Sequence, residues 1–195
     1  TDLERLLAVD MLAKEYGLGI ANPGMIKEVS AALLRGERPL LYAPAPFLTK
    51  SKDAWDGYFK TIPLVDGQTE YSRLLEHREN TPSTAVIITE YQLPEKIHEH
   101  SLILHPRTLC AGIGCKKNSS ASAIAAFVRA TFTRYRLSIH SLAYVASISA
   151  KRNERGLLLA ADALGCPLLF FNSEELNRYP VQSPSPKAMA TFGVL

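Results

Sequence analysis

The sequence predicts an α/β protein of two small lobes, the second of them a three-layer α/β domain with a mostly parallel sheet. Three observations lead to this prediction. A chain of 195 residues suits one large domain or two small ones. Apolar residues recur at helical spacing in some segments and form short continuous runs in others. Residues 106–195 read as strand, helix, strand, helix and strand with short links, which indicates a parallel sheet with right-handed crossovers. We therefore expect a mixed α/β lobe over residues 1–105 and a C-terminal α/β domain over residues 106–195.

Two helices are expected at the start of the first lobe. Residues 3–11 carry leucines and a methionine at helical spacing, and Gly17 is a plausible stop. In the second helix Asn22 is the expected cap, Pro23 suits the first turn, and Gly36 ends the apolar stripe.

The rest of this lobe is expected to supply strands. Short apolar runs predict them at residues 40–42, 58–65, 84–89 and 101–105, with a turn at Asp66-Gly67 and a loop or short turn at 95–100. In most of residues 47–82 the apolar residues follow neither the helical nor the strand periodicity clearly.

The second lobe has a clearer pattern. Strands are expected at residues 108–113, 142–148 and 167–171, and helices at 119–135 and 153–164, the latter closed by Gly165. Ligands of such sheets bind outside the carboxyl ends of the strands. Residues 112–117 and 149–154 occupy strand-end positions of that kind, so they are the first places to look for a site.

Composition favours a cytoplasmic protein. Hydrophobic residues make up 47% of the chain and charged residues 21%, which is ordinary globular usage. No apolar run approaches the roughly 20 residues that span a bilayer, and no secretion signal is recognisable. The three cysteines are odd in number and lack metal-ligand spacing, which indicates reduced thiols. We expect no membrane partner and no metal site.

Charge is distributed unevenly between the lobes. Residues 1–105 hold 11 Lys and Arg against 15 Asp and Glu, a net of −4, whereas residues 106–195 hold 11 against 4, a net of +7. A basic lobe attracts anionic ligands. Its basic residues are scattered and aromatic stacking platforms are few, so nucleic acid is not the expected partner. A small polyanion fits the pattern better.

The turn after the first strand of the second lobe is the strongest candidate for binding. Its glycines allow a close backbone approach, the following helix N-terminus favours an anion, and two lysines add full charges. The alternative is a tight turn with two solvated lysines. A lysine stands where the third glycine of a dinucleotide fingerprint belongs, so nucleotide binding is not favoured. The candidate binding residues are Gly112, Gly114, Cys115, Lys116, Lys117, Ser119 and Ser120.

Cysteine and histidine chemistry has less support. A helix N-terminus and lysines depress a thiol pKa, but a nucleophilic Cys115 also needs a histidine base, and His140 is the main one available in this lobe. Cys115 is better interpreted as a small residue packing the turn. His98, His100 and His105 lack further ligands at a metal-binding interval, so we expect solvated surface histidines.

The second strand end offers Lys151 and Glu154. Glu154 can act as a general base if it is partly desolvated, and Lys151 can bind a carboxylate. The alternative is that Glu154 only complements the dipole of the helix that it opens.

The turn and its flanks, residues 109–120, resemble the glycine-cysteine signature of the cobalamin biosynthesis protein G family, the cobalt-precorrin-5A hydrolases. Asn118 stands where the family usually has glycine, and Ser149 where an acidic residue is common. The first lobe resembles that family's middle domain more weakly, through residues 10–13, 17–18, 22–27 and 31–34. In the second lobe the resemblance covers residues 109–120, 146–151, Glu154, Gly156-Leu157, 164–168 and 170–176.

The resemblance implies a role in the anaerobic pathway of cobalamin biosynthesis. The expected reaction opens the ring-A δ-lactone of cobalt-precorrin-5A with water and releases acetaldehyde, giving cobalt-precorrin-5B. Such chemistry needs an activated water, donors for an oxyanion, and cations for a macrocycle with many carboxylates. From charge and position we assign Glu154 as the catalytic base, the turn as the source of donors, and Lys116, Lys117 and Lys151 as the cations.

Two further expectations follow from this interpretation. The partner is an anionic cobalt-corrinoid intermediate, and no cofactor is expected because the substrate carries the cobalt. A homodimer is left open. The alternative function is a non-catalytic module that binds corrinoids or other tetrapyrroles.

Overall fold

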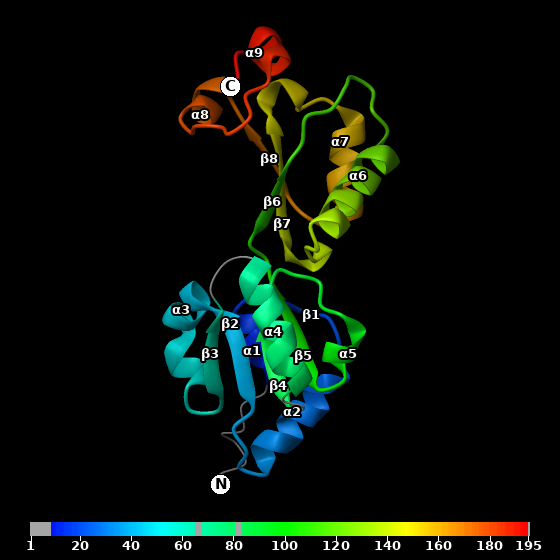
Figure 1. Ribbon diagram of the computed structural model, residues 1–195. Helices are drawn as coiled ribbons and strands as arrows, with labels where there is room; N and C mark the ends of the chain where they lie inside the picture. Colours follow the sequence, from blue (N-terminus) through cyan, green and yellow to red (C-terminus); the bar gives the residue numbers. More distant parts are fainter. Residues whose placement is uncertain (1–8, 65–67, 81–82, 195) are drawn as a thin grey trace. The chain divides into compact units, whose positions relative to one another are not determined.

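The computed structural model describes residues 9–64, 68–80 and 83–194, and they form two compact units. The first unit extends to Arg107 and also includes Arg136–Ser141, and the second contains Thr108–Tyr135 and the chain from Leu142 onward. Each unit has its own sheet (Figure 1). The predicted α/β class, the two lobes and the mostly parallel sheet are confirmed.

The first unit is a five-stranded sheet in the order β1-β5-β4-β2-β3, with β1 antiparallel to β5 and the other pairs parallel. Its elements follow the chain as α1 (Val9–Glu15), β1 (Leu18–Ile20), α2 (Met25–Leu34), β2 (Leu40–Pro44), α3 (Ala45–Trp55), β3 (Lys60–Leu64), α4 (Gln68–Asn80), β4 (Ala85–Ile88), α5 (Glu95–His98) and β5 (Ser101–Pro106).

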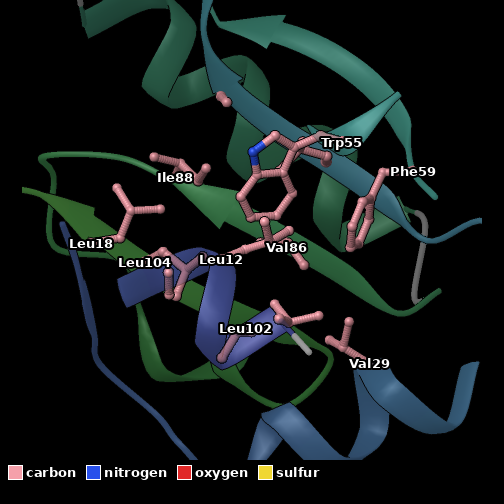
Figure 2. Packing of buried hydrophobic residues seen from close by; sticks show 13 residues of the cluster. Leu12, Leu18, Val29, Trp55, Phe59, Val86, Ile88, Leu102 and Leu104 are labelled. Atoms are coloured by element: carbon pink, nitrogen blue, oxygen red, sulfur yellow. The ribbon is translucent and has the colours of Figure 1, made fainter. Parts of the chain in front are cut away.

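Both faces of this sheet are buried, and alternate residues of one strand pack into different cores. Val86 and Ile88 of β4 belong to a core with Trp55, while Ala85 and Ile87, which alternate with them, pack on the other side with Leu74. Figure 2 shows the first of these cores around the Trp55 ring. Strands buried on both faces read as continuous apolar runs, which is why β4 and β5 were predictable.

Two predictions in this lobe need correction. Asn22 does not cap α2, because Gly24 holds that position. Instead its side-chain amide donates to the carbonyl of Ser101 at 2.8 Å and accepts from the amide of Ile103 at 2.9 Å. Residues 47–82, which gave no clear pattern, contain most of α3 and all of α4, and residues 95–98 form the short helix α5. The first part of the helix expected over residues 3–11, and the Asp66-Gly67 turn, lie outside the described residues.

The second unit has a parallel three-stranded sheet in the order β6-β7-β8. Its elements are β6 (Leu109–Gly112), α6 (Ala121–Arg134), β7 (Leu142–Ile148), η3 (Ser149–Lys151), α7 (Arg155–Leu164), β8 (Leu168–Phe171), α8 (Ser173–Asn177) and α9 (Pro186–Phe192). The short helix η2 (Ile139–Ser141) lies between α6 and β7 in sequence but belongs to the first unit.

Helices α6 and α7 lie side by side, as Figure 1 also shows. They bury apolar residues such as Val128 and Leu157, and Val145 of the central strand is fully buried with them. The side chain of Ala146, which is paired with Gly112, points to the opposite side of the sheet from that of Val145. No helix within the described ranges is long and apolar enough to cross a membrane.

Candidate functional site

A cavity of about 710 Å³ opens at the carboxyl ends of β6, β7 and β8, where the strand-end rule places the ligands of a parallel sheet. Its walls come from the turn after β6, the end of β7 with η3, and the segment that contains α8 and α9. Most of the lining is apolar, and four lysines stand among it. The lining residues are Gly112, Ile113, Gly114, Cys115, Lys116, Lys117, Ala146, Ser147, Ile148, Lys151, Phe171, Leu176, Ser185, Lys187, Ala188, Thr191, Phe192 and Val194.

The turn after β6 is fixed at its start and offers free donors beyond it. The amide of Ile113 donates to the carbonyl of Ala146 at 2.8 Å, and the hydroxyl of Ser147 donates to the carbonyl of Ile113 at 2.7 Å. The amides of residues 114–117 make no hydrogen bond with any other residue that the structure describes. A run of unpaired amides beside a cavity is suited to an anionic oxygen.

Asn118 ends this turn in the left-handed region, with φ at 61°. Glycine adopts that conformation without a steric cost, and asparagine is among the few other residues that tolerate it. The backbone therefore explains why glycine is expected here by resemblance. The following Ser120 caps α6, since its hydroxyl oxygen accepts from the amide of Ala123 at 3.2 Å.

Glu154 connects the two strand-end loops. One carboxylate oxygen accepts from the amide of Asn118 at 3.1 Å, and the other lies 3.2 Å from the ammonium of Lys151. The amide of Asn118 is the main reason that the pKa of Glu154 is lowered; desolvation opposes this, and the ammonium of Lys151 adds to it. Glu154 is thus held as a carboxylate between the turn and η3.

The start of α7 packs closely against the same turn. A Cβ placed on Gly156 would lie 1.8 Å from the backbone carbonyl oxygen of Ser119. Only glycine allows this approach without a shift of the backbone, so Gly156 helps to set the distance between the two loops.

The predicted site residues fall into two neighbouring groups. Gly112, Gly114, Cys115, Lys116 and Lys151 line the large cavity. Ser119, Ser120 and Glu154 line a smaller hollow of about 470 Å³ where α6 and α7 begin, and Lys117 lines both. Glu154 is not part of the large cavity's lining, and its role as a catalytic base stays a prediction.

The segment with α8 and α9 supplies the part of the site that the sequence did not reveal. Phe192 lines the cavity, and its ring centroid lies 5.8 Å from the ammonium of Lys151. Two side chains at α8 hold the end of α9: the hydroxyl of Ser173 donates to the carbonyl of Phe192 at 2.8 Å, and the amide of Asn177 donates to the carbonyl of Gly193 at 2.7 Å. One signal was available, since Ser185 followed by a proline is typical of a helix start.

The histidines lie in the first unit. His105 is only 4% exposed, so the prediction of a solvated surface residue is wrong for it. Its Nδ1 donates to the carbonyl of Thr89 at 2.7 Å, and its ring stacks on that of His140 with centroids 6.0 Å apart. Burial is the main cause that lowers the pKa of His105. His140, the main sequence candidate to activate Cys115, therefore packs in the other unit, and within the described ranges no three His, Cys, Asp or Glu residues could hold a metal ion.

Comparisons with known proteins agree on one pathway. Residues 7–106 match a family described as the cobalamin biosynthesis central region, and residues 109–195 match one described as the cobalamin synthesis G C-terminus. A curated relative from Priestia megaterium, "Cobalt-precorrin-5A hydrolase", is 25% identical over 200 residues that cover all of this chain and 52% of the relative. The chain thus spans about half the length of that relative.

Two solved structures are also similar. One is the crystal structure of CobE, a protein from the cobalamin (vitamin B12) biosynthetic pathway, with 33% identity, a TM-score of 0.42, and coverage of 44% of this chain and 64% of that one. The other is a putative cobalamin biosynthesis protein G homolog from Sulfolobus solfataricus, with 20% identity, a TM-score of 0.36, and coverage of 93% and 49%.

Proposed function

The chain belongs to the cobalamin biosynthesis protein G family, and from this premise we propose that it hydrolyses the ring-A δ-lactone of cobalt-precorrin-5A in the anaerobic pathway. The products are acetaldehyde and cobalt-precorrin-5B. The observation that carries the proposal is the large cavity at the strand ends, which combines an apolar lining with four lysines. A cobalt-corrinoid intermediate has an apolar conjugated ring and many carboxylates, so it needs both features.

The reaction places three demands on a site. Water adds to the lactone carbonyl, the carbonyl oxygen carries negative charge in the intermediate, and the ring C–O bond then breaks. The alkoxide released collapses to acetaldehyde as its bond to the macrocycle breaks, and the macrocycle takes up the electron pair and a proton. A site for this chemistry holds the carboxylates, stabilises the oxyanion and removes a proton from water.

The free amides of residues 114–117 are the proposed oxyanion donors. They lie in the turn that lines the cavity, and the same turn carries the side chains of Lys116 and Lys117. Fixed backbone donors of this kind are worth about a hundredfold or more in rate when they meet the developing charge. The lysines hold the peripheral carboxylates and raise the local concentration of the anionic substrate.

Glu154 is the proposed general base, and its geometry suggests a test of that role. Its carboxylate is bound by the amide of Asn118 and the ammonium of Lys151, so it is ionised at neutral pH but is a weaker base than a free carboxylate. Glu154→Gln keeps the shape and one acceptor oxygen. Loss of a general base lowers kcat by about a hundredfold or more, whereas loss of a merely structural carboxylate lowers it little. Glu95→Gln, which removes an exposed carboxylate at the start of α5 in the first unit, is the matched control.

The second candidate function is corrinoid binding without catalysis, in which the chain serves as a binding module. The position of Glu154 outside the lining of the large cavity favours it, because binding needs only the apolar walls and the lysines. The two functions share the ligand and differ in whether acetaldehyde appears.

The experiment therefore has two readouts on the same chain. A titration followed by the visible bands of an added cobalt corrinoid measures binding, and a coupled alcohol dehydrogenase measures acetaldehyde released from cobalt-precorrin-5A. The control is Lys27→Met, which changes an exposed lysine of α2. The hydrolase is supported if acetaldehyde release is lost in Lys116→Met and kept in Lys27→Met. A spectral shift without release supports the module. The absence of both signals contradicts either function.

A further inference from the structure

Lys151 differs from the other lysines of the large cavity in being held. Lys116, Lys117 and Lys187 are exposed, whereas the side chain of Lys151 is 12% exposed. Its ammonium lies 3.2 Å from a carboxylate oxygen of Glu154 and 5.8 Å from the centroid of the Phe192 ring. The other three lysine side chains are exposed to solvent, whereas this ammonium has a defined place in the wall.

The ammonium can still bind a ligand in that place. A lysine ammonium has three donors, and one of them is used by Glu154. Lys151 and Phe192 both line the cavity, whereas Glu154 does not. The cation therefore stands between its carboxylate partner on one side and the cavity on the other, with donors left for a carboxylate in the cavity.

Phe192 is itself anchored. Its carbonyl accepts from the hydroxyl of Ser173, and the carbonyl of the next residue accepts from Asn177. The ring thus faces the ammonium from a fixed helix end. A cation over an aromatic face is attracted to it, and the attraction is larger when both groups are partly desolvated. Because a fixed lysine has already lost much of its rotamer freedom, it loses less on binding a ligand.

We propose that Phe192 is a positioning residue that holds the ammonium of Lys151 in place for one carboxylate of the bound tetrapyrrole. The inference rests on the proposed function, and it assigns the wall formed by α9 a part in recognising the substrate. Phe192 acts through Lys151 and not through direct contact with the reacting lactone.

The test is a double-mutant cycle on affinity. Cobyrinic acid, a stable cobalt corrinoid with free carboxylates, is titrated into the wild type, Phe192→Leu, Lys151→Met and the double variant, and binding is followed by its visible bands. We expect Phe192→Leu to weaken binding about three- to tenfold and Lys151→Met about tenfold or more. In the double variant we expect the affinity of Lys151→Met alone, because Phe192 has no cation left to hold.

Three controls separate positioning from a general loss of structure. Phe192→Tyr keeps the aromatic face and is expected to bind like the wild type. Phe127→Leu, which alters an exposed aromatic residue of α6 outside the cavity lining, is expected to have no effect. The methyl ester of the same corrinoid, which has no carboxylates, is expected to bind Phe192→Leu and the wild type equally.

A second measurement is independent of ligand and activity. In the free protein the ring of Phe192 should shift the ε-methylene NMR signals of Lys151 upfield, and the shift should disappear in Phe192→Leu and persist in Phe192→Tyr. Absence of that shift in the wild type overturns the contact. A Phe192→Leu effect that is equally large in the Lys151→Met background, or no effect at all, overturns the positioning role. If the wild type binds no corrinoid, the proposed function fails, and the NMR shift still reports on the contact by itself.

Discussion

Gly156→Ala tests the close approach between α7 and the turn before α6. The added methyl carbon would lie 1.8 Å from the carbonyl oxygen of Ser119, and ordinary van der Waals contact begins at 3.4 Å. Both groups belong to the backbone, so no side-chain rotation relieves the overlap. A clash of this kind costs about 3 kcal/mol, and alanine recovers at most about 1 kcal/mol by its better helix propensity. We expect a net loss of about 2 kcal/mol in the free energy of unfolding of the second unit.

The assay combines thermal unfolding with hydrogen exchange. For a unit of this size a loss of about 2 kcal/mol lowers Tm by about 10 °C. Hydrogen exchange should localise the change to peptides that span residues 116–120 and 149–157. Gly114→Ala is the matched control, because a Cβ there meets nothing within 4 Å and its φ is not positive. A Gly156→Ala protein with the Tm and exchange protection of the wild type would refute the close approach.

Three further predictions concern single residues. Asn118→Ala should lower the free energy of unfolding by about 1 kcal/mol and Asn118→Gly should not, because φ at this position is 61°; chemical denaturation compares the two. The lowered pKa of Glu154 means that its contribution to stability is present above the pKa of the unfolded chain and is lost as pH falls through the folded pKa. Glu154→Gln should therefore show a smaller loss of stability in acid than the wild type, measured as Tm against pH below about pH 5. The lowered pKa of His105 likewise stabilises the protein above about pH 6.5, and this part is lost as pH falls further. His105→Gln should flatten the dependence of Tm on pH between about 7.5 and 5.5, and an unchanged slope would contradict burial of a neutral ring.

The sequence predicted secondary structure best where a segment has one clear pattern of apolar residues. Strand β4 is a continuous apolar run, β5 contains the run Leu102–Leu104, and α7 has an apolar stripe closed by Gly165, which adopts φ of 67°. In contrast, α4 escaped prediction because its buried face includes a charge. Arg78 is 5% exposed, and its guanidinium donates to the carbonyl of Ser83 and the hydroxyl of Ser101. A rule that places charged residues on the surface does not recognise such a helix.

The candidate site could be predicted only in part, for a similar reason. The turn after β6 and Lys151 follow from the rule that ligands bind at the carboxyl ends of parallel strands, and both line the cavity. Phe192 and Lys187 could not be predicted in this way, because α9 reaches the cavity through tertiary contacts such as that between Ser173 and the carbonyl of Phe192. Residues 182–187 show no periodicity from which the position of α9 at the cavity could be predicted.

The yield of acetaldehyde from cobalt-precorrin-5A tests directly whether this chain is a hydrolase. The chain is incubated alone with excess substrate, and acetaldehyde is counted against substrate consumed. We expect one acetaldehyde for each substrate, over many turnovers, and a marked loss of release in Lys151→Met. A wild-type protein that binds the substrate, as its visible bands would show, and releases no acetaldehyde would contradict the hydrolase and leave the corrinoid-binding module as the function of this chain.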